Sequence, residues 1–131
     1  MFGKKNQPPI KSLIAHGSVI EGNFRFAEGL RIDGRIVGNV VADPDCASIL
    51  VISESAQVTG EIFADHVIIN GAVTGPVHAS ELLELQPKAK IEGDISYKAL
   101  EMHQGALISG QLRPLIAGDE KRQLKLAASN A

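Results

Sequence analysis

Apolar and polar residues alternate at a period of two along most of the chain, in short runs interrupted by glycine. Six segments share one pattern, in which a small residue, an Ile or Val, a glycine and a second apolar residue occupy every other position. The segments are SVIEGNF from Ser18, GRIVGNV from Gly34, AQVTGEI from Ala56, GAVTGPV from Gly71, AKIEGDI from Ala89 and ALISGQL from Ala106. Alternation at period two is typical of β-strands rather than of helices.

The glycines of this pattern recur at intervals of 16, 22, 15, 18 and 17 residues. They are Gly22, Gly38, Gly60, Gly75, Gly93 and Gly110. Each interval also contains a second apolar pair at spacing two, such as Leu30 and Ile32. Strands this short, repeated once per interval, favour the rungs of a parallel β-solenoid over a hairpin meander. We expect the glycine at a corner, where a side chain has no room or the backbone needs an unusual φ.

The pattern divides the chain of 131 residues into three parts. We predict an all-β, single-domain solenoid of about six rungs over residues 12–116. Residues 1–11 and 117–131 lack the repeat and are predicted to be flexible tails. The longest glycine interval contains residues 42–48, which we interpret as a corner loop, because an insertion there leaves the stacking intact.

Charge is unevenly distributed along the chain. Residues 1–11 carry three lysines and no acidic residue, whereas residues 12–112 carry six basic and thirteen acidic residues, a net charge of −7. Nucleic-acid binding needs a clustered basic face, so the acidic body argues against it. Two apolar side chains followed by two lysines at the start of the chain predict weak binding to anionic membrane lipid. These predicted membrane-binding residues are Met1, Phe2, Lys4 and Lys5.

Candidate catalytic and metal-binding residues are scattered over the repeats. The histidines are His16, His66, His78 and His103, and no two have a ligand spacing such as His-x-x-x-His. Asp65 and His66 are adjacent, so on a strand they would point to opposite sides. We interpret one further group as a polar turn with a reduced thiol: Asp43, Asp45 and Cys46. We interpret the glutamates beside the repeat glycines as solvated positions on the outside of the rungs: Glu21, Glu61 and Glu92. The sequence therefore predicts no enzyme, no cofactor and no metal, and it contains no Gly-x-x-x-x-Gly-Lys-Ser/Thr loop for nucleotide.

The two ends of the predicted solenoid lack an obvious capping element. A terminal rung exposes unpaired N–H and C=O groups, which are a template for another chain. Large apolar residues gather in the first and last repeats: Phe24 and Phe26, and Leu112, Leu115 and Ile116. Core filling explains each of these residues singly, but apolar groups at two uncapped ends favour end-to-end self-association through them.

The repeat pattern leaves more than one kind of solenoid protein open. Small aliphatic residues every six positions, as in hexapeptide acyltransferases, occur in one stretch: Val73, Ala79, Leu85, Ile91 and Tyr97. The uneven glycine intervals break that hexad elsewhere. A soluble adaptor that does not polymerise is another alternative, because the repeat pattern alone does not distinguish it from a filament-forming solenoid.

The six rungs with short polar tails resemble the bactofilin family over residues 12–116. The stretches Leu30-Arg31-Ile32-Asp33-Gly34 and Val67-Ile68-Ile69-Asn70-Gly71 reinforce this resemblance, as does the opening Met1-Phe2-Gly3-Lys4-Lys5. The resemblance implies a right-handed, three-sided parallel β-helix that polymerises end to end without nucleotide. It also implies a cytoplasmic filament on the inner face of a bacterial membrane, which positions cell-wall synthesis or hydrolysis enzymes and influences cell shape.

Overall fold

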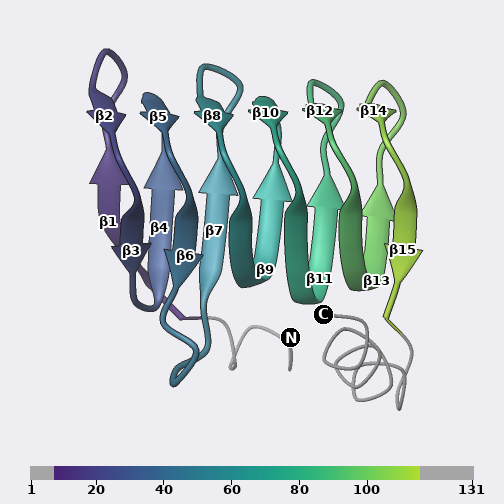
Figure 1. Cartoon of the computed structure of the whole chain (residues 1–131), viewed down its shortest axis with the longest axis horizontal. Coiled ribbons are helices and arrows are strands. Elements are labelled where there is room, and N and C mark those ends of the chain that lie inside the picture. The colour runs from purple at the N-terminus through teal and green to yellow at the C-terminus, as the bar shows by residue number, and fades with distance from the viewer. Residues whose placement is uncertain (1–7, 116–131) are drawn as a thin grey trace, which may run out of the picture.

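The computed structural model describes residues 8–115, and the regular secondary structure in this range consists of fifteen β-strands (Figure 1). Every pair of neighbouring strands is parallel. Strands from successive rungs lie side by side along the long axis of the molecule, from the purple first rung to the yellow last one. The prediction of a parallel β-solenoid of about six rungs is confirmed.

The strands form three faces, which we call A, B and C. Face A contains β2 (Val19–Glu21), β5 (Arg35–Val37), β8 (Gln57–Thr59), β10 (Ala72–Thr74), β12 (Lys90–Glu92) and β14 (Leu107–Ser109). Face B contains β3 (Phe24–Phe26), β6 (Val40–Ala42), β15 (Leu112–Pro114) and the first parts of β9 (Ile62–Ile69), β11 (Val77–Leu85) and β13 (Ile95–Met102). Face C contains β1 (Ile10–Ile14), β4 (Gly29–Ile32), β7 (Ile49–Ile52) and the second parts of the same three long strands.

The corner between faces B and C changes along the stack. In the later rungs one long strand bends around it, and the register shifts between Ala79 and Leu82 of β11. In the second rung the chain leaves β6 at Ala42 and enters β7 only at Ile49. The connection projects from the body between these strands (Figure 1), as the sequence predicted for residues 42–48. It leaves the pairing of β7 with β4 and β9 intact.

Apolar side chains stack in columns inside the solenoid. On face A the register aligns one Ile or Val from every rung, and this is the column that the repeat predicted: Ile20, Ile36, Val58, Val73, Ile91 and Ile108. The middle four are at most 1% exposed, whereas Ile20 and Ile108 are only partly buried. The difference follows from position, because a terminal rung is covered on one side only.

The repeat glycines form a ladder along one corner. All six have positive φ angles, between 122° at Gly22 and 155° at Gly110. A Cβ added at Gly75 would overlap the carbonyl oxygen of Gly60, and the same overlap recurs down the ladder. At Gly22, which lies in the first rung of the described residues, an added Cβ would meet nothing within 4 Å. The corner therefore needs glycine for its backbone conformation in every rung, and also for close packing wherever a preceding rung is present.

Asparagine and aspartate side chains accept hydrogen bonds at the same corner. The Asn23 side-chain oxygen accepts a hydrogen bond from the backbone N–H of Asn39 at 3.0 Å, and that of Asn39 accepts one from Glu61 at 2.9 Å. Asp94 accepts one from the N–H of Gln111 at 2.9 Å in the last rungs. These bonds link successive rungs outside the strands themselves.

The ladder predicts a difference between a central and a terminal glycine. Gly75→Ala combines backbone strain of about 1–3 kcal/mol with overlap against the preceding rung, whereas Gly22→Ala introduces the strain alone. We expect a clearly larger loss of thermal stability for Gly75→Ala, measured by far-UV circular dichroism. Equal losses for the two variants would contradict the packing part of this account.

Candidate functional site at the ends of the solenoid

Exposed apolar side chains concentrate in the first and last rungs. Of the eight large hydrophobic residues that are exposed within residues 8–115, six belong to these two rungs. They are Ile10, Leu13 and Val19 in the first rung and Met102, Leu107 and Leu112 in the last. The other two, Val37 and Phe63, lie on inner rungs. The exposed apolar residues therefore concentrate in the two terminal rungs, where Leu13, Val19 and Leu107 occupy outward positions.

At the last rung, two core columns come to an open end. Leu112 continues the buried column of Val77 and Ile95 on face B, yet it is 46% exposed. Met102 continues the column of Ile69 and Leu85 on face C and is 48% exposed. Both side chains occupy core positions, and their exposure results from the absence of a following rung among the described residues.

At the first rung, aromatic side chains close much of the opening. Phe26 aligns with Ala42 on the next rung and is only 7% exposed, so it fills core space that small residues leave free. Phe24 is half-buried and packs against the same core. Of the interface residues predicted from sequence, Leu112 is thus exposed, while Phe24 and Leu115 are partly exposed. Phe26 offers little surface, and Ile116 lies outside the described residues.

The sequence pattern missed several apolar residues of the terminal rungs. Ile10, Leu13, Val19 and Leu107 lie on terminal strands but outside the core columns predicted from the repeat. Ile10 also precedes the predicted start of the solenoid, yet it pairs with Gly29. A count of apolar residues at outward positions of the first and last repeats would have found them.

Both ends also present unpaired strand edges. In the described part of the chain, β1, β2 and β3 each pair with strands on one side only. The same holds for β14, β15 and the second part of β13 at the other end. Edges of this kind are able to accept further parallel or antiparallel strands from another chain.

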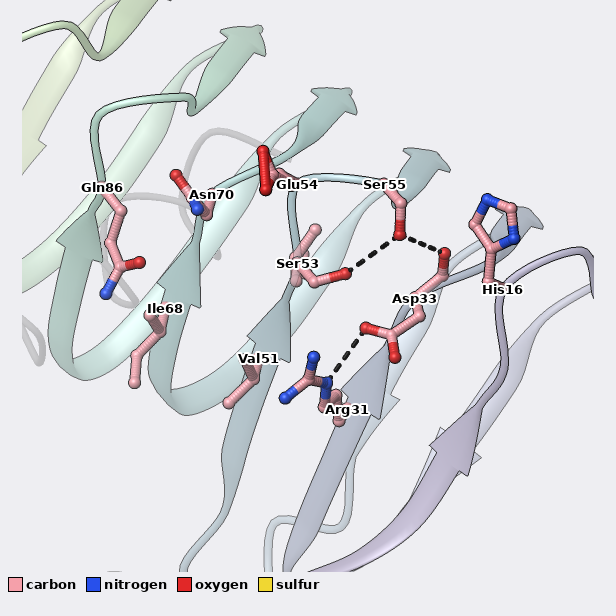
Figure 2. A pocket seen from close by; sticks show the side chains of 11 residues that line it. His16, Arg31, Asp33, Val51, Ser53, Glu54, Ser55, Ile68, Asn70 and Gln86 are labelled. Carbon is pink, nitrogen blue, oxygen red and sulfur yellow. Dashed lines mark hydrogen bonds and ion pairs between the residues drawn. The ribbon is translucent and has the colours of Figure 1, made fainter.

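A polar groove runs along the corner between faces C and A (Figure 2). It contains Arg31 and Asp33, whose side chains are 3.0 Å apart, together with Ser53 and Ser55. The serine hydroxyls donate to the backbone carbonyls of Ile32 and Asp33, at 3.1 and 2.9 Å. The serines therefore act as links between rungs, in a geometry unlike that of an activated nucleophile.

Asp33 is held in its charged form. The Ser53 hydroxyl is the largest cause that lowers the pKa of the Asp33 carboxyl. Desolvation, the next largest effect, raises this pKa, and the hydrogen bond and charge of the Arg31 guanidinium lower it further. A general acid at neutral pH needs the opposite shift. The groove thus stabilises a carboxylate and does not prepare a proton donor.

The four histidines lie in four different surroundings. His16 lines the groove, and His78 stacks on Phe63 with ring centroids 4.5 Å apart while its Nε2 lies 2.7 Å from Glu61. His66 is half-buried, and burial lowers its pKa although Glu84 and Glu101 oppose the shift. His103 follows β13 near the last rung. These positions bring no two histidines into one metal-binding group among residues 8–115.

The remaining candidates have structural partners. Asp65 accepts from the backbone N–H of Ser48 at 3.1 Å and from the hydroxyl of Ser80 at 2.6 Å, so it joins three rungs at the corner between faces B and C. Asp43 accepts from the N–H of Asp45 at 2.9 Å, which closes the turn that also contains the half-buried Cys46. Glu21 and Glu92 are exposed on face A.

One group of side chains was not apparent from spacing along the sequence. Glu84, Glu101 and His103 come from neighbouring strands of face C, and their donor atoms all lie within 4.8 Å of one another. Glu84 and Glu101 are 17 positions apart, which is one rung of the solenoid in this region. Projecting the polar residues onto the rung spacing would have placed them together.

The predicted membrane-binding residues, Met1, Phe2, Lys4 and Lys5, lie outside the described residues. Within residues 8–115, no helix is long and apolar enough to cross a membrane.

Comparisons with known proteins agree with this architecture. The family model Bactofilin, described as polymer-forming cytoskeletal, matches residues 12–113. Bactofilin BacO of Myxococcus xanthus is 27% identical over 111 residues, which cover 85% of each chain. Bactofilin BacP of the same organism is 24% identical over 101 residues, which are 77% of this chain but only 40% of that protein. No solved structure gives a significant match.

The family match distinguishes between the solenoid families considered above. It spans nearly all of the region whose strands stack in the structure, and it carries the description of a structural, polymer-forming protein rather than of an acyltransferase. The fold, the open ends and the family model agree, and the chain belongs to the bactofilin family of polymer-forming cytoskeletal proteins.

Proposed function

We propose that this protein forms filaments by stacking solenoids end to end, and that these filaments are a membrane-bound scaffold for cell-wall enzymes. The observation that carries the first part is the concentration of exposed apolar residues and unpaired strand edges in the two terminal rungs. The membrane and scaffold parts rest on the composition of the N-terminal segment and on the family resemblance.

End-to-end contact would satisfy the groups that the isolated chain leaves exposed. Leu112 and Met102 sit in core columns, so a further apolar surface placed on the last rung would bury them as an additional rung does. Fully burying one such side chain is worth about 1.5–3 kcal/mol. Backbone N–H and C=O groups at the edges add directional bonds that favour a defined register. Assembly of this kind uses the same interactions as the fold.

Assembly of this kind needs no nucleotide. The sequence lacks a phosphate-binding loop, and the groove along the corner between faces C and A uses its serine hydroxyls to bind backbone carbonyls. In this proposal the free energy of assembly comes from burial of apolar surface and from backbone pairing at the strand edges.

Membrane attachment is assigned to the N-terminal segment. Phe2 contributes about 1.5–3 kcal/mol on insertion, and each lysine near an anionic leaflet adds about 1 kcal/mol. One copy therefore binds weakly and reversibly. A filament presents many copies on one polymer, and this multivalency converts weak contacts into stable attachment. The attached polymer would then hold synthesis or hydrolysis enzymes of the cell wall at the inner face of the membrane.

The first test concerns the ends. Leu112→Arg places a charge in an interface where it is buried without a partner, at a cost of about 3 kcal/mol or more, which corresponds to about a hundredfold weaker association. We expect the parent chain to form filaments in buffer with a chelator and without nucleotide, as seen by negative-stain microscopy. Leu112→Arg should sediment as small species with unchanged far-UV circular dichroism.

Two further variants serve as controls for this test. Thr74→Arg adds the same charge at an exposed position of a central rung and should leave the filaments intact. Val73→Arg adds it to the core, where the parent residue is 1% exposed, and should unfold the chain. Filaments formed equally well by Leu112→Arg, or a strict need for ATP or GTP, would contradict the proposed assembly.

The second test concerns the membrane and uses sedimentation with liposomes. The double variant Lys4→Gln with Lys5→Gln should lose most of its binding to vesicles that contain phosphatidylglycerol. The matched variant Lys88→Gln with Lys90→Gln removes two exposed lysines of the solenoid and should bind like the parent. Leu112→Arg should also bind poorly, because a single tail lacks multivalency. Undiminished binding after deletion of residues 2–5 would remove the N-terminal segment from the mechanism.

A further inference from the structure

Three potential metal ligands meet on the outer side of face C, in the last two rungs. Glu84 belongs to β11, Glu101 to β13, and His103 follows β13 directly. The Nε2 atom of His103 lies 3.5 Å from a carboxylate oxygen of Glu84 and 3.6 Å from one of Glu101. The side chains are half-buried to exposed, so an ion would reach them from solvent.

These distances suit one small cation. Zn²⁺ binds histidine nitrogen and carboxylate oxygen at about 2.0–2.2 Å with tetrahedral geometry, which places neighbouring ligand atoms about 3.3–3.6 Å apart. The two separations from His103 match this value, and the remaining pair lies within 4.8 Å. A small rotation of one carboxylate would complete a three-ligand site with one position left for water.

The backbone holds all three ligands in register. Glu84 and Glu101 are paired residues of adjacent strands, and the N–H of His103 donates to the carbonyl of Leu85 at 2.8 Å. The Gln86 side chain donates to the Glu84 carboxylate at 3.1 Å and orients it. Ligands that are fixed in this way lose little conformational freedom when an ion binds.

The pairing of the two glutamates also favours a bound cation, and the His66 imidazole interacts electrostatically with both carboxylates. Like charges at directly paired positions of adjacent strands are destabilising. The same outward column carries Leu13, Arg31, Val51 and Ile68 in the earlier rungs, so acidic residues occur together only at its end within the described strands. A divalent ion between the carboxylates would turn this repulsion into attraction.

We propose that Glu84, Glu101 and His103 form a Zn²⁺ site that clamps the last rung of face C onto the preceding one. The imidazole nitrogen selects a transition metal of this class over Ca²⁺, which takes six to eight oxygen ligands, and over Mg²⁺, which demands octahedral oxygen coordination. The bound ion links β11 to β13 at the end of the solenoid, where the second part of β13 pairs on one side only. Binding involves a single chain and does not depend on filament formation.

The test measures metal binding by the full chain with Cys46→Ser as the parent, which removes the single thiol as a competing ligand. Calorimetric titration with Zn²⁺, and the visible spectrum with Co²⁺ as a probe, should both give one site per chain. His103→Gln, Glu84→Gln and Glu101→Gln should each weaken binding by more than about tenfold, since even residues that only orient a ligand affect affinity by about 10–100-fold. Zn²⁺ should raise the melting temperature of the parent and leave that of His103→Gln unchanged.

A matched control comes from a histidine–glutamate pair on face B. His78→Gln removes a histidine whose Nε2 lies 2.7 Å from Glu61 on face B, where the structure brings no third ligand to the pair, and it should bind Zn²⁺ like the parent. Repeating the titration in Leu112→Arg separates this site from assembly, because the site should persist when filaments are lost. Unchanged affinity in His103→Gln, or equal binding of Ca²⁺ or Mg²⁺, would overturn the proposal. Absence of Zn²⁺ binding by the parent chain would likewise overturn it.

Discussion

The close stacking of one rung on the next is the constraint on which the rest of the structure depends. At the glycine corner the backbones of neighbouring rungs approach so closely that a single added carbon at Gly38 would overlap the carbonyl of Gly22. Positive φ angles at this corner direct the chain from face A to face B, so that the next strand falls in register. Once the rungs are in register, the apolar columns follow, because equivalent residues of successive rungs lie directly above one another.

A stack held by identical contacts has no intrinsic end. Each inner rung is covered on both sides, and the core column that contains Val77 and Ile95 is fully buried in these rungs. The same column leaves Leu112 almost half exposed at the last rung, with no change in its chemical character. The same apolar stacking and backbone pairing would therefore drive both the folding of the chain and the assembly of the filament. The contact that adds a rung to a chain is also the contact that would add a chain to a filament.

Interactions that recur in every rung can be predicted from the sequence, whereas interactions that occur only once cannot. The glycine column and the Ile/Val columns were predictable because every rung contains them, and the core column of face A lies as expected. Phe26 is only 7% exposed and fills core space beside Ala42, a packing detail that depends on the volumes of the neighbouring side chains. The group of Glu84, Glu101 and His103 was not found because its members are distant in sequence and meet only through the register.

Charge explains why growth would follow the axis rather than the sides of the solenoid. Residues 12–112 carry a net charge of −7, and acidic residues such as Glu21 and Glu92 lie on the outer surface of the rungs. Two solenoids side by side would repel each other over distances up to the Debye length, about 8 Å at physiological ionic strength. The terminal rungs expose apolar side chains of the core columns, such as Leu112 and Met102, for which salt screening matters little. One surface thus opposes contact and the other favours it, and a one-dimensional polymer is the result that satisfies both.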